Sequence, residues 1–213
     1  MTAAEFVPAG AGIEKLREAA QGCRGCELWK GATQTVFSAG FTTARVVLVG
    51  EQPGDQEDRQ GQPFVGPAGR LLVKAIDEAG IPREQTYRTN VVKHFRFSQA
   101  GPGKRRIHQT PEMQHINACR PWLVEELRLV DPEIIVCLGA TATKALLGSA
   151  VRVTSDRGSL MERETSVGPR QFLVTVHPSA VLRADNRDQA YDGLVADLRV
   201  AASVLGEDPA RTE

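Results

Sequence analysis

The sequence carries no excess of charge of either sign. Lys and Arg together number 26, Asp and Glu together number 26, and the formal net charge is therefore zero. This balance argues against a protein that coats nucleic acid through its overall electrostatic field. The balance does not exclude local basic patches, and the run at residues 104–106 is one.

The sequence also has no long hydrophobic run, and its first residues lead us to expect no leader peptide. The longest apolar runs, at 46–49 and 134–138, are far shorter than the roughly 20 residues that cross a bilayer. The first residues, MTAAEFVPAGAG, have neither the cationic nor the apolar region of a signal peptide. These absences predict a cytoplasmic protein that contacts no membrane.

The sequence has no phosphate-binding signature. The stretch GEQPGDQED, which starts at Gly50, lacks the Gly-Lys-Ser/Thr ending of a P-loop and the glycine spacing of a dinucleotide site. Its acidic residues Glu51 and Asp55 would repel phosphates. A protein that binds small nucleotides on an α/β fold is therefore disfavoured.

Cysteine is scarce, with four residues at Cys23, Cys26, Cys119 and Cys137. A disulfide framework is not expected in a cytosolic chain of this size. The CRGC pair and the two distant cysteines could together form one four-thiolate site. Spacing alone does not distinguish zinc from an iron–sulfur cluster, because both accept four thiolates.

Short apolar runs alternate with helical patterns along the chain. The strand candidates are ARVVLVGE, TYRTNVVKHF, EIIVCLGA and QFLVTVHPSA, and the helix candidates are residues 12–21, 67–80, 110–130, 141–148 and 189–205. This alternation predicts a three-layer α/β/α sandwich with a central, mainly parallel four-stranded sheet. We expect a single domain over residues 1–213, with a frayed tail at 206–213.

In such sheets the ligand crevice lies beyond the carboxyl ends of the strands. The segments that begin at Glu51, Asn90 and His177 all leave such ends. The sequence therefore predicts one site at this edge, to which the basic stretch GKRRIH also belongs.

The motifs at these strand ends resemble the uracil-DNA glycosylase superfamily, in particular its iron–sulfur family four enzymes. They are GEQPGDQED, GQPFVGPAG, TNVVK and HPSA, and with the cysteines they extend from Cys23 to Arg183. Two departures from family four resemble the UdgX-type subgroup. These are Gln52, where alanine is usual, and the long stretch HFRFSQAGPGKRRIHQTP after TNVVK.

The resemblance implies excision of uracil from DNA by cleavage of the N-glycosidic bond. The base must first leave the stack or lie in a single strand. By resemblance Phe64 stacks on uracil, Asn90 recognises its edge through its amide, and Glu57 excludes the methyl group of thymine. Gly54 and Asp55 are expected in the same pocket.

The resemblance to the UdgX-type subgroup also implies that His108, the histidine of KRRIH, bonds covalently to the abasic C1′. A neutral imidazole is a better nucleophile than water once it lies within about 3–3.5 Å of that carbon. We expect Glu51, with Gln52, to orient the imidazole, and His177 to stabilise the departing uracil anion. The predicted function is single-turnover DNA repair that ends in a protein–DNA adduct.

Further residues are expected to hold DNA and a cofactor. Lys104, Arg105 and Arg106 would contact backbone phosphates, and Leu182 and Arg183 would probe the groove and fill the vacated stack. By resemblance the four cysteines bind a structural [4Fe–4S] cluster. The expected partner is uracil-containing DNA, preferably single-stranded, acted on by a monomer.

Two alternatives stay open at this point. The first is a conventional multiple-turnover glycosylase, in which water is the nucleophile and His108 is an ordinary loop residue. The second is a non-catalytic protein that binds uracil-containing or single-stranded DNA. Release of free uracil would distinguish this binder from both enzymes.

Overall fold

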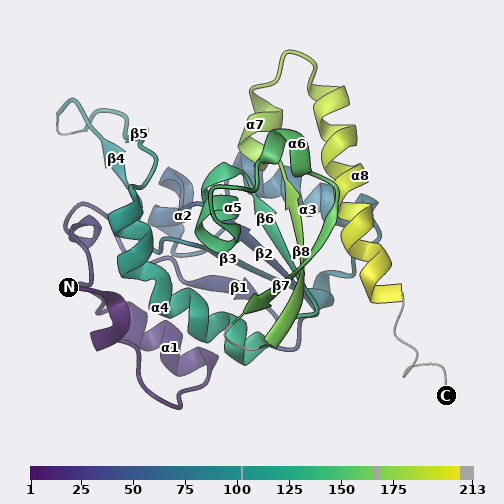
Figure 1. Ribbon diagram of the computed structural model, residues 1–213. Coiled ribbons are helices and arrows are strands. Elements are labelled where there is room, and N and C mark those ends of the chain that lie inside the picture. Colours follow the sequence, from purple (N-terminus) through teal and green to yellow (C-terminus); the bar gives the residue numbers. More distant parts are fainter. Residues whose placement is uncertain (102, 166–167, 207–213) are drawn as a thin grey trace.

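The computed structural model describes residues 1–101, 103–165 and 168–206. Within them, six strands form one sheet in the order β1-β3-β2-β6-β8-β7 (Figure 1). These strands are β1 (Ser38–Gly40), β2 (Val46–Gly50), β3 (Thr86–Asn90), β6 (Ile134–Leu138), β7 (Leu160–Thr165) and β8 (Gly168–Thr175). Strands β3, β2, β6 and β8 run parallel, as predicted, while β1 and β7 add antiparallel edges that the sequence did not indicate.

The two edge strands gave no hydrophobic signal. β1 spans only three residues, and most residues of β7 are exposed. In contrast, every residue of β2 and β6 is buried, as expected for parallel strands that are covered on both faces. Alternate residues of β2 point to opposite faces, so that Val47 and Val49 enter one core and Val46 and Leu48 the other.

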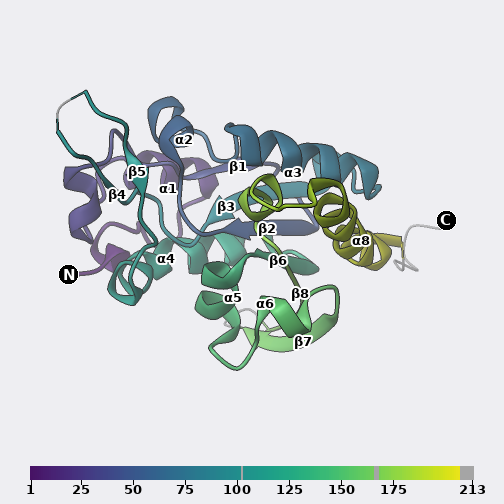
Figure 2. The ribbon, with the colours of Figure 1, turned by 90° about the horizontal axis from the view of Figure 1, so that it is seen from above.

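Helices cover both faces of the sheet (Figure 2). The core of one face contains residues of α1, α4 and α5, and the core of the other contains residues of α3, α7 and α8. The helices are α1 (Ile13–Ala20), α2 (Asp55–Gln60), α3 (Pro67–Glu78), α4 (Met113–Val130), α5 (Ala140–Leu147), α6 (Val153–Asp156), α7 (Pro178–Leu182) and α8 (Arg187–Gly206), with 3-10 turns η1 (Ala3–Glu5), η2 (Glu27–Lys30) and η3 (Arg83–Gln85). The predicted α/β/α layering is confirmed.

Most predicted helix limits differ from the structure by one to three residues. Helix α4 begins at Met113 rather than at 110, because Arg96 binds the Thr110 carbonyl and the Glu112 carboxylate and Glu112 caps the helix. Helix α8 continues to Gly206, which the prediction placed in a frayed tail. The rest of that tail, 207–213, lies outside the described residues. No described helix is both long and apolar enough to cross a bilayer.

A small hairpin carries the basic stretch. Strands β4 (Phe97–Ser98) and β5 (Ile107–His108) pair antiparallel, with Phe97 opposite His108. Both views show this hairpin beside α2 and outside the main sheet (Figures 1 and 2). The sequence predicted only a loop here, because two-residue strands are too short to show an alternating pattern.

Candidate active site

The carboxyl edge of the sheet brings together the ends of several segments that are distant in sequence. Nε2 of His108, on the hairpin, lies 3.2 Å from Oε1 of Glu51, which directly follows β2. His108 and Arg183 both lie near enough to His177 to lower its pKa. The predicted convergence of His108, Glu51 and His177 at one edge is thus what the structure shows.

The carboxylate of Glu51 has a second partner that the sequence did not suggest. Thr141, in the first turn of α5, donates its hydroxyl hydrogen bond to Oε2 of Glu51. Since His108 lies at Oε1, the two oxygens of one carboxylate have different neighbours. Thr141 therefore limits the rotation of the group that faces the imidazole.

A glycine brings the predicted base-binding residues together. A Cβ atom on Gly50 would lie 2.4 Å from Oδ1 of Asn90 and 2.9 Å from Cζ of Phe64. The amide and the ring thus meet at the end of β2, where any larger residue would displace them. Phe64 has φ of 59°, a left-handed conformation, and Gly69 of α3 approaches its carbonyl too closely to allow a side chain.

Glu57 is held between two glycines of the same site. Its Oε1 accepts a hydrogen bond of 2.9 Å from the backbone N–H of Gly66, and a Cβ atom on Gly54 would lie 2.6 Å from its Oε2. Gly54 is also the N-cap of α2. Glu57 and Gly54, both predicted in the base pocket, are therefore neighbours in the structure.

Asp55 and Arg106 make contacts that the sequence did not predict. The guanidinium of Arg106 binds the carboxylates of Asp55 and Asp58, the latter at 2.6 Å, and lies about 5 Å from the ring centroids of Phe95 and Phe97. Its side chain is only 8% exposed. Burial acts against ionisation of Asp55, but the hydrogen bonds from Arg59 and Arg106 outweigh it and lower its pKa.

Arg106 thus attaches the hairpin to α2 and faces the protein interior. The structure differs here from the expectation of a phosphate contact, because the Arg106 guanidinium donates to two carboxylates and to the backbone carbonyl of Asp55. Lys104 and Arg105 are exposed, and neither makes an ion pair within the part of the chain that the structure describes. The expected phosphate contacts at Lys104 and Arg105 stay predictions.

Gln52 holds the other end of the hairpin. Its Nε2 donates to the carbonyls of Arg96 and Gln109 at 3.0 and 3.1 Å, and its Oε1 accepts from the backbone N–H of Arg96. The side chain is 7% exposed. The structure therefore places Gln52 on the hairpin backbone, whereas we expected it to orient the imidazole of His108 directly.

His177 is neutral in a defined tautomer. Burial, with smaller effects of His108 and Arg183, lowers its pKa to about 4. Its Nδ1 accepts a hydrogen bond of 3.2 Å from the backbone N–H of Ser179, so the ring proton is on Nε2. Leu182 is half-buried in α7 and Arg183 is exposed at the end of that helix, next to His177.

The cysteines have part of the surroundings that a thiolate cluster needs. Cys23, Cys119 and Cys137 belong to one core and Cys26 packs against it. Nε1 of Trp122 donates to Sγ of Cys23, and the backbone N–H of Lys93 donates to Sγ of Cys119, each at 3.3 Å. Burial raises the pKa of Cys119 and of Cys137 to about 12. Among the described residues, no three metal-ligating side chains are close enough to hold an ion.

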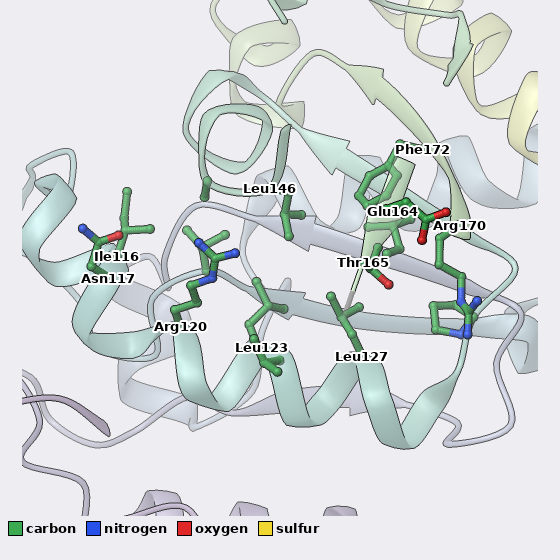
Figure 3. A pocket seen from close by; sticks show the side chains of 15 residues that line it. Ile116, Asn117, Arg120, Leu123, Leu127, Leu146, Glu164, Thr165, Arg170 and Phe172 are labelled. Carbon is green, nitrogen blue, oxygen red and sulfur yellow. The ribbon is translucent and has the colours of Figure 1, made fainter. Parts of the chain in front are cut away.

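A groove elsewhere on the molecule contains none of the predicted site residues. It has a volume of about 160 Å³ and lies between α4, α5, β7 and β8 (Figure 3). Its walls are mainly apolar, with Arg120, Glu164 and Arg170 among the lining side chains. The residues that could do chemistry lie at the carboxyl edge of the sheet instead.

The carboxyl edge of the sheet thus carries a carboxylate, two imidazoles and an amide beside an aromatic ring. Such a site is suited to bind a planar ring with hydrogen-bonding edges and to react on it. The chain belongs to the uracil DNA glycosylase superfamily, whose family profile matches residues 37–199. This membership confirms the predicted superfamily and enzyme class, a uracil-DNA glycosylase that acts on DNA.

Individual relatives agree with this assignment. A type-4 uracil-DNA glycosylase of Thermotoga maritima is 37% identical over 198 residues, which are 92% of this chain and 96% of that protein. A type-4 enzyme of Sulfurisphaera tokodaii is 36% identical over 184 residues, covering 82% and 77%. A type-5 enzyme of Pyrobaculum aerophilum is 29% identical over 189 residues, covering 84% and 80%. The predicted closeness to family four is thereby confirmed.

Proposed function

We propose that this chain excises uracil from DNA and that His108 then forms a covalent bond to C1′ of the abasic sugar, so that each molecule reacts once. The observation that carries the proposal is the placement of His108, with Nε2 at 3.2 Å from the Glu51 carboxylate. A carboxylate at this position can orient the imidazole and accept its proton, as the partner of a nucleophile does in covalent catalysis.

Base recognition is the first step of the proposed reaction. A uracil outside the base stack enters between the Phe64 ring and the Asn90 amide, which can both donate to and accept from the uracil edge. Glu57, fixed by the backbone N–H of Gly66, is close to this pocket and would exclude a methyl group at C5. The N–H at Nε2 of His177 is free to donate to a uracil oxygen, because Nδ1 already accepts from Ser179.

Bond cleavage and capture follow. The bond between C1′ and N1 breaks, and its electron pair leaves with uracil as an anion that the His177 N–H stabilises. The lone pair of the His108 ring nitrogen that Glu51 leaves free then forms the bond to C1′. The proton on the other ring nitrogen passes to Glu51, and the uracil anion takes a proton from water. The product is an N-alkyl imidazole, which has no easy route to hydrolysis.

The hairpin contacts support this assignment of His108. Arg106 attaches the hairpin to α2 and Gln52 holds its base, so that the imidazole is presented on a fixed backbone. Positioning of this kind can contribute several kcal/mol to a reaction, on the order of 7–11 in the best intramolecular cases.

The rival function is conventional, multiple-turnover excision with water as the nucleophile. The names of the type-4 relatives favour it. In that reaction Glu51 would orient a water molecule at the position proposed here for His108. The two functions share the pocket and differ only in the atom that attacks C1′.

A denaturing gel distinguishes them. The protein is incubated with a labelled uracil-containing single-stranded oligonucleotide, boiled in SDS and compared with the His108→Ala and Glu51→Gln variants. Our proposal predicts a shifted band that survives boiling, is absent for His108→Ala and forms more slowly for Glu51→Gln. An unshifted oligonucleotide with alkali-labile abasic sites would establish water as the nucleophile.

We also propose that Cys23, Cys26, Cys119 and Cys137 hold a [4Fe–4S] cluster. The N–H groups of Trp122 and Lys93 that point at two of the sulfurs suit thiolate ligands, and bound iron would overcome the high thiol pKa values, because metals bind the deprotonated form. The cluster would join the chain before β1 to α4 and β6. Iron and acid-labile sulfide should both be lost in the Cys119→Ser variant.

The remaining proposals concern the substrate form and the cell. A single-stranded substrate would spare the enzyme the energy of unpairing the base. We propose that the chain prefers it, acts as a monomer and is cytoplasmic. Excision rates on matched single- and double-stranded oligonucleotides test the first of these directly.

A further inference from the structure

A fully buried ion pair lies next to the end of β3, where Asn90 is located. Nζ of Lys93, three residues after Asn90, pairs with the carboxylate of Glu126 on α4, and the two side chains are 1% and 0% exposed. Burying two charges is costly unless every hydrogen-bonding position is used. The partners of both groups therefore indicate what the pair does.

The ammonium of Lys93 uses its three N–H donors completely. It donates to Glu126, to Oγ1 of Thr89 and, at 3.0 Å, to the backbone carbonyl of Asn90, while the carbonyl of Phe37 is a more distant acceptor at 3.5 Å. It also lies 5.1 Å from the centroid of the Phe37 ring. One of the three donors thus acts on the backbone of the residue that we assign to uracil recognition.

The carboxylate of Glu126 is held just as firmly. Tyr87 and Thr89, both on β3, donate their hydroxyl hydrogen bonds to it at 3.0 and 2.8 Å. Burial, with Glu126 as the next cause, raises the pKa of Tyr87 well above its usual value, so the phenol stays a donor. Helix α4 therefore fixes the position of the Lys93 side chain.

The backbone that follows Asn90 is fixed as well. The N–H groups of Val91 and Val92 donate to the carbonyls of Gly50 and Glu51 at 3.0 and 3.1 Å. The N–H of Lys93 donates to Sγ of Cys119. Residues 90–93 thus connect the end of β2 with α4, and Lys93 contacts α4 through both its backbone and its side chain.

We infer that Lys93, held by Glu126, is a positioning residue for base recognition, which fixes the Asn90 carbonyl and thereby the direction of the Asn90 amide in the uracil pocket. The inference rests on the proposed role of Asn90. A pair that only stabilised the fold would not have to direct a donor at Asn90, and its removal would lower stability without changing the affinity for uracil.

The test uses the full chain and free uracil as a competitive inhibitor of excision. Removing one charge alone leaves the other unpaired, so the main variant is Lys93→Met combined with Glu126→Gln. We expect its inhibition constant for uracil to rise about tenfold, since hydrogen bonds to charged groups contribute on this order. The half-saturating protein concentration in single-turnover excision should rise in parallel.

Two single variants serve as matched controls. Tyr87→Phe removes a hydrogen bond to Glu126 from the same buried cluster but does not touch Asn90, so it should lower thermal stability and leave uracil inhibition within about twofold. Asn90→Ala measures the full loss of the recognising amide. If the double variant does not fold, Glu126→Asp decides, because it keeps both charges but draws the carboxylate away from Lys93. We expect it to weaken uracil inhibition about threefold.

Each outcome is decisive. The inference would be overturned by native uracil inhibition in the folded double variant, or in Glu126→Asp if that one is used, together with a loss in Asn90→Ala. Native inhibition in Asn90→Ala would instead overturn the assignment of Asn90 on which the inference rests. An equal loss in Tyr87→Phe would also overturn it, because general destabilisation would then explain the effect.

Discussion

At the scale of single residues, the carboxylate of Glu51 links the two groups that matter most for the proposed capture. One oxygen lies 3.2 Å from His108, and the other accepts the hydrogen bond of Thr141. The meeting of Glu51 and His108 could be expected from the sequence, because both belong to segments at one edge of a parallel sheet. Thr141 could not, because a threonine in the first turn of a helix has no distinctive pattern.

Replacement of Thr141 tests its role as a positioning residue. Thr141→Val keeps the shape of the side chain but removes the donor, so Glu51 can rotate away from His108. We expect the rate of covalent capture to fall about tenfold, the effect of losing one hydrogen bond to a charged group. Thr141→Ser keeps the hydroxyl and should stay within about twofold. Single-turnover gel assays measure both rates, and equal rates for Val and Ser would contradict this role.

At the scale of elements, the hairpin β4–β5 is the part that the sequence described least well. GKRRIH suggested a phosphate-binding loop because three cations are adjacent, but cations in one run can have different partners. Arg106 turns inward to Asp55 and Asp58, while Lys104 and Arg105 are exposed. The acidic residues of α2 that accept Arg106 lie some fifty positions earlier, a separation that no local pattern reveals.

Arg106→Lys distinguishes an internal attachment from a phosphate contact. Lysine keeps the charge but cannot bind two carboxylates with a planar fork. We expect covalent capture to slow by on the order of a hundredfold, because breaking a buried charged pair costs roughly 3–5 kcal/mol, only part of which falls on the reacting geometry.

Arg105→Lys is the matched control for this change and should retain the native rate. The salt dependence of DNA binding should be the same in both variants, since each keeps its charge. A native rate in Arg106→Lys would show that charge alone suffices and would favour the phosphate contact.

Whether the other helices and strands could be predicted also depended on how clear a local pattern each one has. The four parallel strands and the helices that cover them could be predicted from the sequence. Buried strands are continuous apolar runs, and apolar residues recur every three to four positions along an amphipathic helix. Helix α2 escaped detection because its sequence, DQEDRQ, is wholly polar. The start of α4 was displaced because Arg96, a distant residue, holds residues 110–112 outside the helix.

At the scale of the whole molecule, two neutral histidines, the buried His94 and the half-buried His177, connect stability with pH. Burial lowers the pKa of His94 and of His177 to about 4 each. Nε2 of His94 lies 2.9 Å from Oγ1 of Thr35, whose own hydroxyl donates to the Ala20 carbonyl, so His94 is the donor in that pair. His94 thereby ties the end of α1 to the segment that follows β3.

The free energy of unfolding should therefore fall in mild acid. In the unfolded chain a histidine has a pKa of about 6.5, so between that pH and about 4 the unfolded state binds more protons and acid favours it. The expected slope is at most about 1.4 kcal/mol per pH unit for each histidine. Urea unfolding at pH 7, 6 and 5 measures it, and His94→Gln, which keeps a donor but does not titrate, should show a shallower slope. A free energy that is constant over this range would contradict the lowered pKa of both groups.

The fold places His108 at the sheet edge where Glu51, Asn90 and His177 also lie. Covalent capture at this place is the central claim, and the intact mass of the protein tests it most directly. The native protein is incubated with a uracil-containing oligonucleotide and then analysed by mass spectrometry under denaturing conditions. We expect a species whose mass is that of the protein plus the oligonucleotide minus uracil. After digestion, the added mass should lie on the peptide that contains His108. An unmodified protein, beside an oligonucleotide that has lost uracil and gained water, would contradict the account.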